Sequence, residues 1–199
     1  MNEQNVFAGS IYESLTPFEI NGLMFRDFFN APDSAARHIP LRHLLDGCDL
    51  PEEERRNVEY DFNALFVGPA ELLAPPYACV YLDDAPVLMG PTTLSVRAFL
   101  QRMGLAVAAE NSVPDDHISH EIELVVMLSV HARHSPQYQD ALARFVCGHL
   151  ELWLPAFIEK INLNAKTSAI KRLALQLTKE GANKQVISSQ ADSLIKISR

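Results

Sequence analysis

The stretch over residues 67–91 constrains the fold of this chain more than any other. It holds five prolines in 25 positions and two glycines: Pro69, Pro75, Pro76, Pro86, Pro91, Gly68 and Gly90. Because proline lacks a backbone N–H and clashes with the preceding helical turn, no continuous helix can cross this stretch. We predict a long ordered loop, with residues 79–82 briefly extended. A solvated linker between two helical subdomains is the alternative, and the aromatic residues Tyr77 and Tyr81 disfavour it.

Start and stop signals predict helices on both sides of this loop. Asp49, with a glutamate three residues later, favours a capped helix start, and Thr92 or Thr93 favours another. Pro40 predicts a break within one helix, and Pro155 predicts the start of a new short one. The expected helices cover roughly residues 17–29, 34–45, 49–66, 92–104, 118–133, 136–154, a short piece from 155, and 167–181, with a weaker pattern over 183–198.

Eight or nine helices without a convincing sheet predict an all-α fold. We expect one helical domain over residues 1–199, in which the loop at 67–91 separates an N-terminal from a C-terminal helical part. The hydrophobic content of 48% supports a globular core and not a disordered chain.

The charge balance narrows the class of partner. The chain carries 25 acidic residues against 17 lysines and arginines, a formal net charge of −8. Nucleic-acid binding needs a basic face that displaces counterions, so we exclude a nucleic-acid partner. Docking on anionic lipid is disfavoured for the same reason, and an acidic surface suits a basic partner.

The cysteines and the apolar runs indicate the compartment. The three cysteines, Cys48, Cys79 and Cys147, are far apart and form no CxxC pair, so we predict neither disulfides nor a zinc module. The first residues lack the pattern of a signal peptide. The apolar runs are shorter than the roughly 20 residues that span a bilayer. We therefore expect a cytoplasmic protein without membrane insertion.

Catalytic signals are weak. His117, His120, His131 and His134 suggest a metal site, but on one helix His120 and His131 would be about 16 Å apart. Asp116 and His117 suggest an acid–base pair, with no nucleophile placed beside them, and an aspartate at a helix start is commonly a cap. We predict no enzyme activity, no metal and no cofactor. The alternative is a small metal-dependent hydrolase that uses Asp116, His117 and His120.

The two loops together predict a binding groove. One is rich in proline and aromatic residues, and the other ends in the carboxylates of Asp115 and Asp116. An apolar floor with an acidic rim would accept a peptide that has apolar residues and arginine, because guanidinium groups pair bidentately with carboxylates.

Three segments resemble the TorD/DmsD family, and the DmsD type in particular. They are Leu65-Phe66-Val67-Gly68-Pro69 with Pro75-Pro76-Tyr77-Ala78-Cys79-Val80-Tyr81-Leu82-Asp83, Val87-Leu88-Met89-Gly90 and Thr93-Leu94; then Pro114-Asp115-Asp116-His117-Ile118; and, more weakly, residues 149–157. The resemblance covers about residues 62–157, and the rest of the chain matches only loosely. Gly68, Pro69, Pro75 and Pro114 are its structural motif residues.

The resemblance implies an all-helical maturation chaperone. Members bind the twin-arginine leader peptide of a molybdenum-containing oxidoreductase, such as a DMSO or TMAO reductase catalytic subunit, and delay export until the cofactor is loaded. By motif, the implied leader contacts are Phe62, Leu65, Phe66, Pro76, Tyr77, Tyr81, Asp116 and His117. His117 would act as a hydrogen-bonding and packing residue, and Asp116 as either the arginine partner or the helix cap.

A second non-catalytic hypothesis stays open. The chain could be a helical scaffold that binds a folded partner and not a leader. The long loop between helical halves is compatible with a monomer or with a domain-swapped dimer. The client enzyme and the binding of a nucleotide are not specified by the sequence.

Overall fold

The computed structural model describes residues 15–85, 87, 89–107 and 113–181. In these ranges the chain forms eight continuous helices and no strand, which confirms the all-α prediction. Two of the helices contain a π-helical turn. The weaker pattern at 183–198 lies outside the described residues. The elements are α2 (Pro17–Asn30), α3 (Ser34–Leu44), α4 (Glu52–Phe62) with η3 (Asn63–Val67), α5 (Cys79–Leu82), α6 (Pro91–Arg102), α7 (Ile118–Ala132), α8 (Pro136–Phe145) with η4 (Val146–Leu150) and α9 (Glu151–Asn164), and α10 (Ser168–Gly181).

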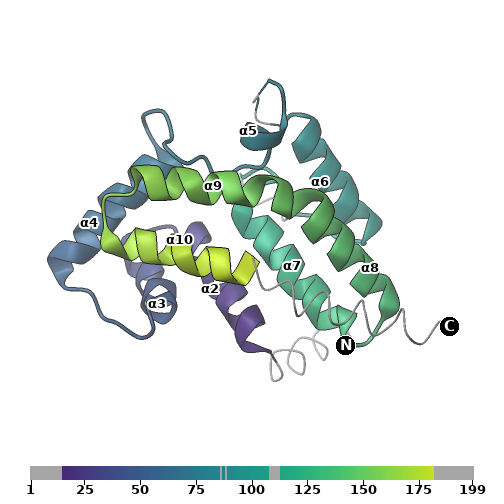
Figure 1. Cartoon of the computed structure of the whole chain (residues 1–199), viewed down its shortest axis with the longest axis horizontal. Coiled ribbons are helices and arrows are strands. Elements are labelled where there is room, and N and C mark those ends of the chain that lie inside the picture. Colours follow the sequence, from purple (N-terminus) through teal and green to yellow (C-terminus); the bar gives the residue numbers. More distant parts are fainter. Residues whose placement is uncertain (1–14, 86, 88, 108–112, 182–199) are drawn as a thin grey trace, which may run out of the picture.

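The helices pack in two layers (Figure 1). In the front layer α9 and α10 lie side by side, and α8 runs through η4 into α9. Behind them α2 packs along α7, and α7 also packs against α8. The long loop and α5 lie at one edge, between α9 and α6. The loop is therefore part of one packed molecule and does not act as a linker between separate halves.

Phenylalanines from four segments form the middle of the core. Phe28 of α2 packs edge-on against Phe62 of α4, with ring centroids 5.3 Å apart. Phe62 packs in turn on Phe66, at 5.1 Å, and Phe66 on Phe157 of α9, at 5.9 Å. Edge-to-face aromatic pairs add to the stabilisation from burying their area. These contacts join both parts of the chain across the loop.

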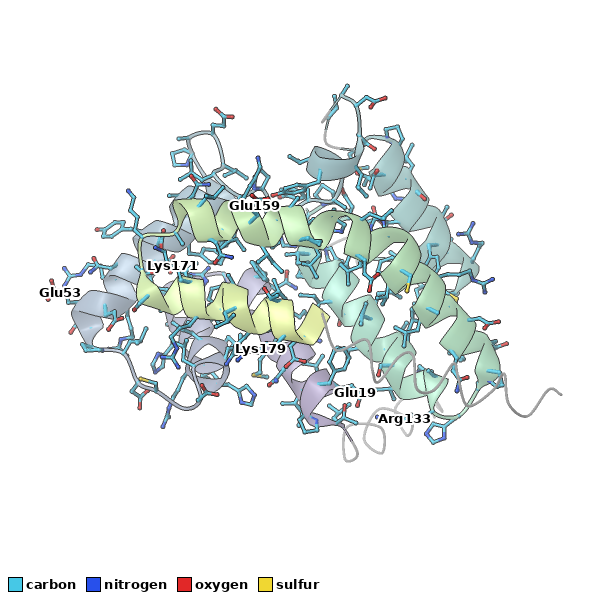
Figure 2. The ribbon with its side chains drawn as sticks, in the orientation of Figure 1. Glu19, Glu53, Arg133, Glu159, Lys171 and Lys179 are labelled. Carbon is cyan, nitrogen blue, oxygen red and sulfur yellow. The ribbon has the colours of Figure 1, made fainter. Side chains whose placement is uncertain are left out.

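A buried ion pair fastens the start of α2 to the end of α7. The Glu19 side chain is fully buried and accepts hydrogen bonds from Arg133 at 2.8 and 2.9 Å and from the Ser129 hydroxyl at 2.9 Å. It also caps its own helix, because it accepts from the Thr16 N–H at 2.8 Å. Figure 2 shows Glu19 and Arg133 facing one another at this end of the molecule.

Two predicted helix breaks at prolines are wrong. α3 continues through Pro40, which is buried with Leu41 and Leu44, so packing offsets the one missing backbone hydrogen bond. Pro155 starts no new helix, because it lies inside α9 within a helix that is continuous from residue 136 to residue 164. The π turn at Val146–Leu150 precedes it by one turn.

Three features at helix starts also differ from prediction. α4 begins after Pro51 without a side-chain cap, and Asp49 pairs instead with Arg42 at 3.2 Å. α6 begins at Pro91 after Gly90, so neither predicted threonine is its cap. Asp49 is engaged by Arg42 and the Thr93 hydroxyl by Asp116, so neither side chain caps the predicted helix. Residues 79–82 form a helical turn in place of the predicted extended segment.

Within the described part of the chain, one helix is long and apolar enough to cross a membrane, judged by length and composition only. It is the continuous 29-residue helix from Pro136 to Asn164, and half of its most apolar window is buried inside the molecule. The two segments predicted as separate helices, residues 136–154 and a short piece from 155, therefore form one helix that is longer than expected. Buried core helices of globular proteins pass the same test, so the feature is weak evidence for a membrane span.

Candidate functional site

The two predicted loops meet. The Ala78 N–H donates to the Asp116 carbonyl at 3.0 Å, and the Ile118 N–H donates to the Pro76 carbonyl at 2.9 Å. Between these bonds Tyr77 and His117 form an isolated antiparallel bridge. We call this contact of residues 76–79 with 116–118 the loop junction. It places residues 68–83 beside 114–117, as the groove hypothesis requires.

Asp116 fixes the loop junction from inside. Its side chain is fully buried, one carboxylate oxygen accepts from the Cys79 N–H at 2.9 Å, and the other accepts from the Thr93 hydroxyl at 2.8 Å. The predicted capping role is wrong, because His117 is the N-cap of α7. With both oxygens engaged and no exposure, Asp116 is also not presented to an external arginine in this structure. Asp115, the other predicted rim carboxylate, pairs with Arg97 at 2.6 Å.

His117 is a neutral packing residue. Its Nδ1 lies 2.7 Å from the Ser119 hydroxyl and accepts from the Ser119 N–H at 3.3 Å. Its ring packs edge-on against Tyr77, with centroids 5.1 Å apart. Burial, together with the nearby His120, lowers the pKa of His117 to about 3. The hydrogen-bonding and packing role predicted for His117 agrees with this geometry.

The groups at the loop junction are poorly placed for catalysis. Burial and the neighbouring Asp116 raise the pKa of the Cys79 thiol to about 12, so the thiol stays protonated and unreactive near neutral pH. The His117 and His120 rings are 6.1 Å apart, and His120 Nε2 is buried without a hydrogen-bond partner in the described part of the chain. Among the described residues no group of three His, Cys, Asp or Glu side chains is arranged to hold a metal ion.

The predicted leader contacts divide by burial. Five belong to the interior, with side chains between 0% and 6% exposed: Phe62, Leu65, Phe66, Asp116 and His117. Pro76 is also buried, whereas Tyr77 and Tyr81 are half-buried and reach the surface. Contact of all eight residues with a peptide stays a prediction, and the buried ones serve the core in this conformation. The interior positions of Phe62 and Phe66 follow from the ring packing described above.

The motif residues shape the loop. Gly68 has φ of +99°, a conformation that L side chains rarely adopt, and it ends the π turn of η3. The Pro75 carbonyl accepts from the Tyr81 hydroxyl at 2.9 Å, which closes the turn before α5. The Pro114 carbonyl accepts from the His117 N–H at 3.1 Å. Pro69, which follows Gly68 in a cis peptide, is exposed.

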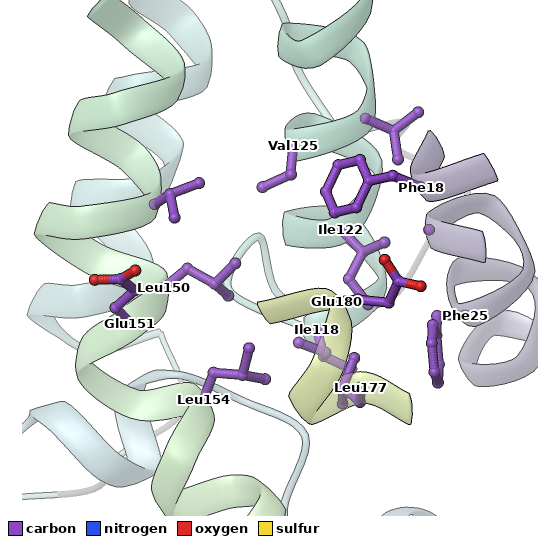
Figure 3. A pocket seen from close by; sticks show the side chains of 13 residues that line it. Phe18, Phe25, Ile118, Ile122, Val125, Leu150, Glu151, Leu154, Leu177 and Glu180 are labelled. Carbon is purple, nitrogen blue, oxygen red and sulfur yellow. The ribbon is translucent and has the colours of Figure 1, made fainter. Parts of the chain in front are cut away.

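An apolar hollow adjoins the loop junction on the side of Ile118 (Figure 3). It lies between α2, α7, α10 and the helix formed by η4 and α9, and it encloses about 60 Å³. Its lining is apolar except for two glutamates: Phe18, Gly22, Phe25, Ile118, Ile122, Val125, Val126, Val146, Leu150, Leu154, Leu177, Glu151 and Glu180. We call this site the apolar hollow.

The two carboxylates of the apolar hollow come from different helices. Glu151 begins α9, and Glu180 is in the last turn of α10. Both side chains are half-buried, and Glu180 accepts a hydrogen bond from the Asn21 side-chain amide at 2.7 Å. An apolar floor with acidic side chains was predicted where the two loops meet. The structure has an apolar surface with two glutamates between helices instead, in the apolar hollow. Sequence reasoning missed the site because its lining comes from four segments that are distant along the chain.

Comparison with known proteins is consistent with this fold. Residues 30–159 match the family model described as nitrate reductase delta subunit. The chain is 31% identical over 121 residues to the "Probable Tat proofreading chaperone DmsD" of Haemophilus influenzae, which covers 61% of this chain and 57% of that protein. It is 30% identical over 155 residues to the "Chaperone protein TorD" of Vibrio cholerae serotype O1, covering 72% of this chain and 70% of that protein.

A solved structure has a similar fold. It is a putative redox enzyme maturation protein from Archaeoglobus fulgidus, with a TM-score of 0.54 and 18% sequence identity over 83% of this chain and 94% of that chain. The likeness shows that the two proteins share an all-helical fold. The chain belongs to the nitrate reductase delta subunit family, and the resemblance to TorD and DmsD is confirmed. It spans little more than half the length of its DmsD relative from H. influenzae.

Proposed function

We propose that this protein is a cytoplasmic, non-catalytic chaperone that binds the twin-arginine leader peptide of a molybdenum-containing oxidoreductase. By holding the leader, it would assist maturation of the enzyme and delay export until the cofactor is loaded. Family membership supports the class of function, since relatives are named Tat proofreading chaperone DmsD and chaperone TorD. The whole activity and the client are proposals for this chain.

The observation that carries the proposal is the composition of the apolar hollow. A leader of this kind has an apolar segment beside a pair of arginines. The apolar hollow, of about 60 Å³, has room for a side chain of the first part among apolar side chains from α2, α7, α9 and α10, and it has Glu151 and Glu180 beside it for the second. Burying apolar leader surface there would favour the complex, because it removes apolar surface from water. A guanidinium next to a carboxylate adds orientation.

The loop junction has a supporting role in this proposal. It fixes Ile118, the first residue of α7, by a backbone hydrogen bond to Pro76, and Ile118 is part of the floor of the apolar hollow. Tyr77 and Tyr81 remain the proposed surface contacts of the loop. Tyr81 stacks on Trp153 with ring centroids 5.5 Å apart, and Lys160 lies over its ring.

Calorimetric titration with leader peptides tests the function. The ligands are the twin-arginine leaders of the molybdoenzymes of the same host, with a Lys-Lys version and a scrambled version of each as controls. We expect binding of at least one leader, weakened by both controls. Absence of binding to every leader would reject the proposal. Equal capture of full-length and leader-deleted client would favour the scaffold hypothesis, in which a folded body is the target.

A further inference from the structure

A second groove, separate from the apolar hollow, lies between α6 and the helix formed by α8 and η4. Its volume is about 640 Å³, within the range of small-molecule sites. We call it the basic groove. It is lined by Ser95, Val96, Phe99, Arg102, Met103, Ala141, Arg144, Phe145, Gly148 and His149.

The charge of the basic groove is opposite to that of the protein. Its lining contains two arginines and one histidine, and no carboxylate, although the chain as a whole carries a formal charge of −8. Arg102 and Arg144 are both exposed, and within the described ranges neither forms an ion pair. By contrast, Arg97, five residues before Arg102 on α6, pairs with Asp115. Among the residues that the structure describes, the guanidinium groups of the basic groove therefore have no carboxylate partner.

His149 is held in the wall of the basic groove by a buried carboxylate. Its Nε2 lies 2.6 Å from Glu121 Oε1, and Glu121 is fully buried in α7. The other Glu121 oxygen accepts from the Trp153 indole N–H at 3.0 Å. The His149 ring also packs against Phe145, with centroids 5.0 Å apart. A side chain fixed by a carboxylate and a ring is already oriented for a ligand, so binding need not order it.

The remaining lining is apolar. Phe99 and Met103 are half-buried and contribute exposed apolar surface, and Phe99 packs on Phe145 at 5.1 Å. Arg102 lies over the Phe99 ring, 5.8 Å from its centroid. The basic groove thus combines cationic groups with an aromatic floor. That combination suits a ligand with an anionic group on an apolar or ring-bearing body.

We propose that the basic groove binds a small organic phosphate, with Arg102 and Arg144 contacting the phosphate oxygens and Phe99 contacting the apolar body. A phosphate is favoured over a carboxylate because its three terminal oxygens can engage two guanidinium forks together, whereas one carboxylate is satisfied by one fork. His149 is a positioning residue that completes the wall. The site would be independent of leader binding in the apolar hollow.

The fluorescence of Trp153 can report ligand binding in the basic groove. Trp153 is the only tryptophan in the chain, and Glu121 links it directly to His149. A ligand that contacts His149 changes the hydrogen bonding of Glu121, and therefore the environment of the indole. Tryptophan fluorescence should respond to occupancy of the basic groove, and Glu121→Gln should reduce that response without removing binding.

The test is a calorimetric titration of the full chain with phenyl phosphate, alongside phenol, benzoate and inorganic phosphate. We expect phenyl phosphate to bind with Kd below about 1 mM, and about tenfold more tightly than each of the other three. Arg102→Gln and Arg144→Gln should each weaken it about tenfold. Arg56→Gln, which changes an exposed arginine on α4 outside the basic groove, should leave it unchanged.

Three outcomes would overturn the proposal. The first is absence of phenyl phosphate binding at millimolar concentration, and the second is wild-type affinity in both arginine variants. The third is benzoate, or an acidic peptide, binding more tightly than phenyl phosphate with the same dependence on Arg102 and Arg144, which would assign the basic groove to carboxylates of a protein partner. Both arginines are exposed, so the variants should fold, and a melting curve checks this.

Discussion

The carboxylate of Asp116 accepts the backbone N–H of Cys79 at 2.9 Å, so the second loop holds the first from the inside. The same carboxylate accepts the hydroxyl of Thr93 on α6. One buried carboxylate therefore joins the proline-rich loop, the start of α7 and the start of α6. Its role in this structure is to build the loop junction that positions Ile118 at the apolar hollow.

Asp116→Ala should destabilise the fold. The substitution leaves the buried Cys79 N–H and the Thr93 hydroxyl without an acceptor, and each unsatisfied buried group costs about 1–3 kcal/mol. We expect a loss of about 2–4 kcal/mol in the free energy of unfolding, measured by urea titration. Thr93→Val removes only one of the two bonds and should cost less. Wild-type stability in Asp116→Ala would show that the carboxylate has no structural role.

Stability should fall as the pH is lowered, with a contribution from His117. Its pKa is about 3 in the fold because burial disfavours the charged ring, against an ordinary value of 6.5. The unfolded chain therefore binds the extra proton between pH 6.5 and pH 3. The contribution of His117 is complete above pH 6.5 and is lost as the pH falls toward 3, by at most about 1.4 kcal/mol per pH unit.

The variant His117→Asn isolates this contribution. Asparagine is a good N-cap, so it can keep the start of α7 while removing the titrating group. The difference in unfolding free energy between wild type and variant should shrink or change sign as the pH falls from 7 to 4. A difference that is independent of pH would contradict a buried neutral His117. Glu121, whose pKa is raised by burial, is present in both proteins and cancels in the comparison.

Arg133→Ala should be more damaging than an ordinary surface change. It removes the cation that faces Glu19, a carboxylate with no solvent exposure. Burial alone would raise the pKa of Glu19, but the hydrogen bonds from Thr16 and Arg133 lower it overall, so the group is charged in the fold. Leaving that charge uncompensated should cost about 2–4 kcal/mol.

The double variant Glu19→Gln with Arg133→Ala is the matched control for this ion pair. It removes the buried charge together with its partner, so it should recover part of the loss measured for Arg133→Ala in urea unfolding. If the double variant is as unstable as the sum of the two single changes, the two side chains are not coupled.

Local patterns predicted the helices well but not their ends. The helix at 17–29 and the loop at 67–91 follow from apolar spacing and from proline content, which are properties of neighbouring residues. The caps at Asp49 and Thr93 were mispredicted because other groups take these side chains. Asp49 pairs with Arg42, seven residues earlier, and the Thr93 hydroxyl donates to Asp116 of the second loop. Pro40 does not break α3, since burial of its ring favours the helical packing.

The contact between the two loops was predicted from sequence, whereas the apolar hollow was not. The motif residues correctly indicated that residues 76–79 and 116–118 meet. Sequence could not show that the Asp116 carboxylate is turned inward, because that depends on donors from α5 and α6. The apolar hollow is lined in part by side chains of α2 and α10. The local periodicity of these helices predicts which face is buried, but it does not predict which helix packs against that face.

The close approach of α2 to α7 at Gly22 supports one side of the apolar hollow. A Cβ added at Gly22 would lie 2.6 Å from Val126 Cγ2, which is too close for two carbons. Gly22→Ala should therefore move α2 away from α7 and cost about 1–3 kcal/mol, although alanine is the better helix former. Val126→Ala in the same chain should relieve the clash. Thermal melting of both single variants and the double variant measures this, and additive losses would contradict it.

The most direct test of the central claim is leader binding by a protein whose apolar hollow is filled. Val125 is nearly buried in the wall of the apolar hollow (Figure 3), so Val125→Phe should occupy the space that the apolar segment of the leader would use. Leu152→Phe, at an exposed position on α9, is the matched control. Calorimetry should give at least about tenfold weaker leader binding for Val125→Phe, with the control and both melting temperatures close to wild type. A folded Val125→Phe protein that binds the leader as tightly as wild type would contradict the assignment of leader binding to the apolar hollow.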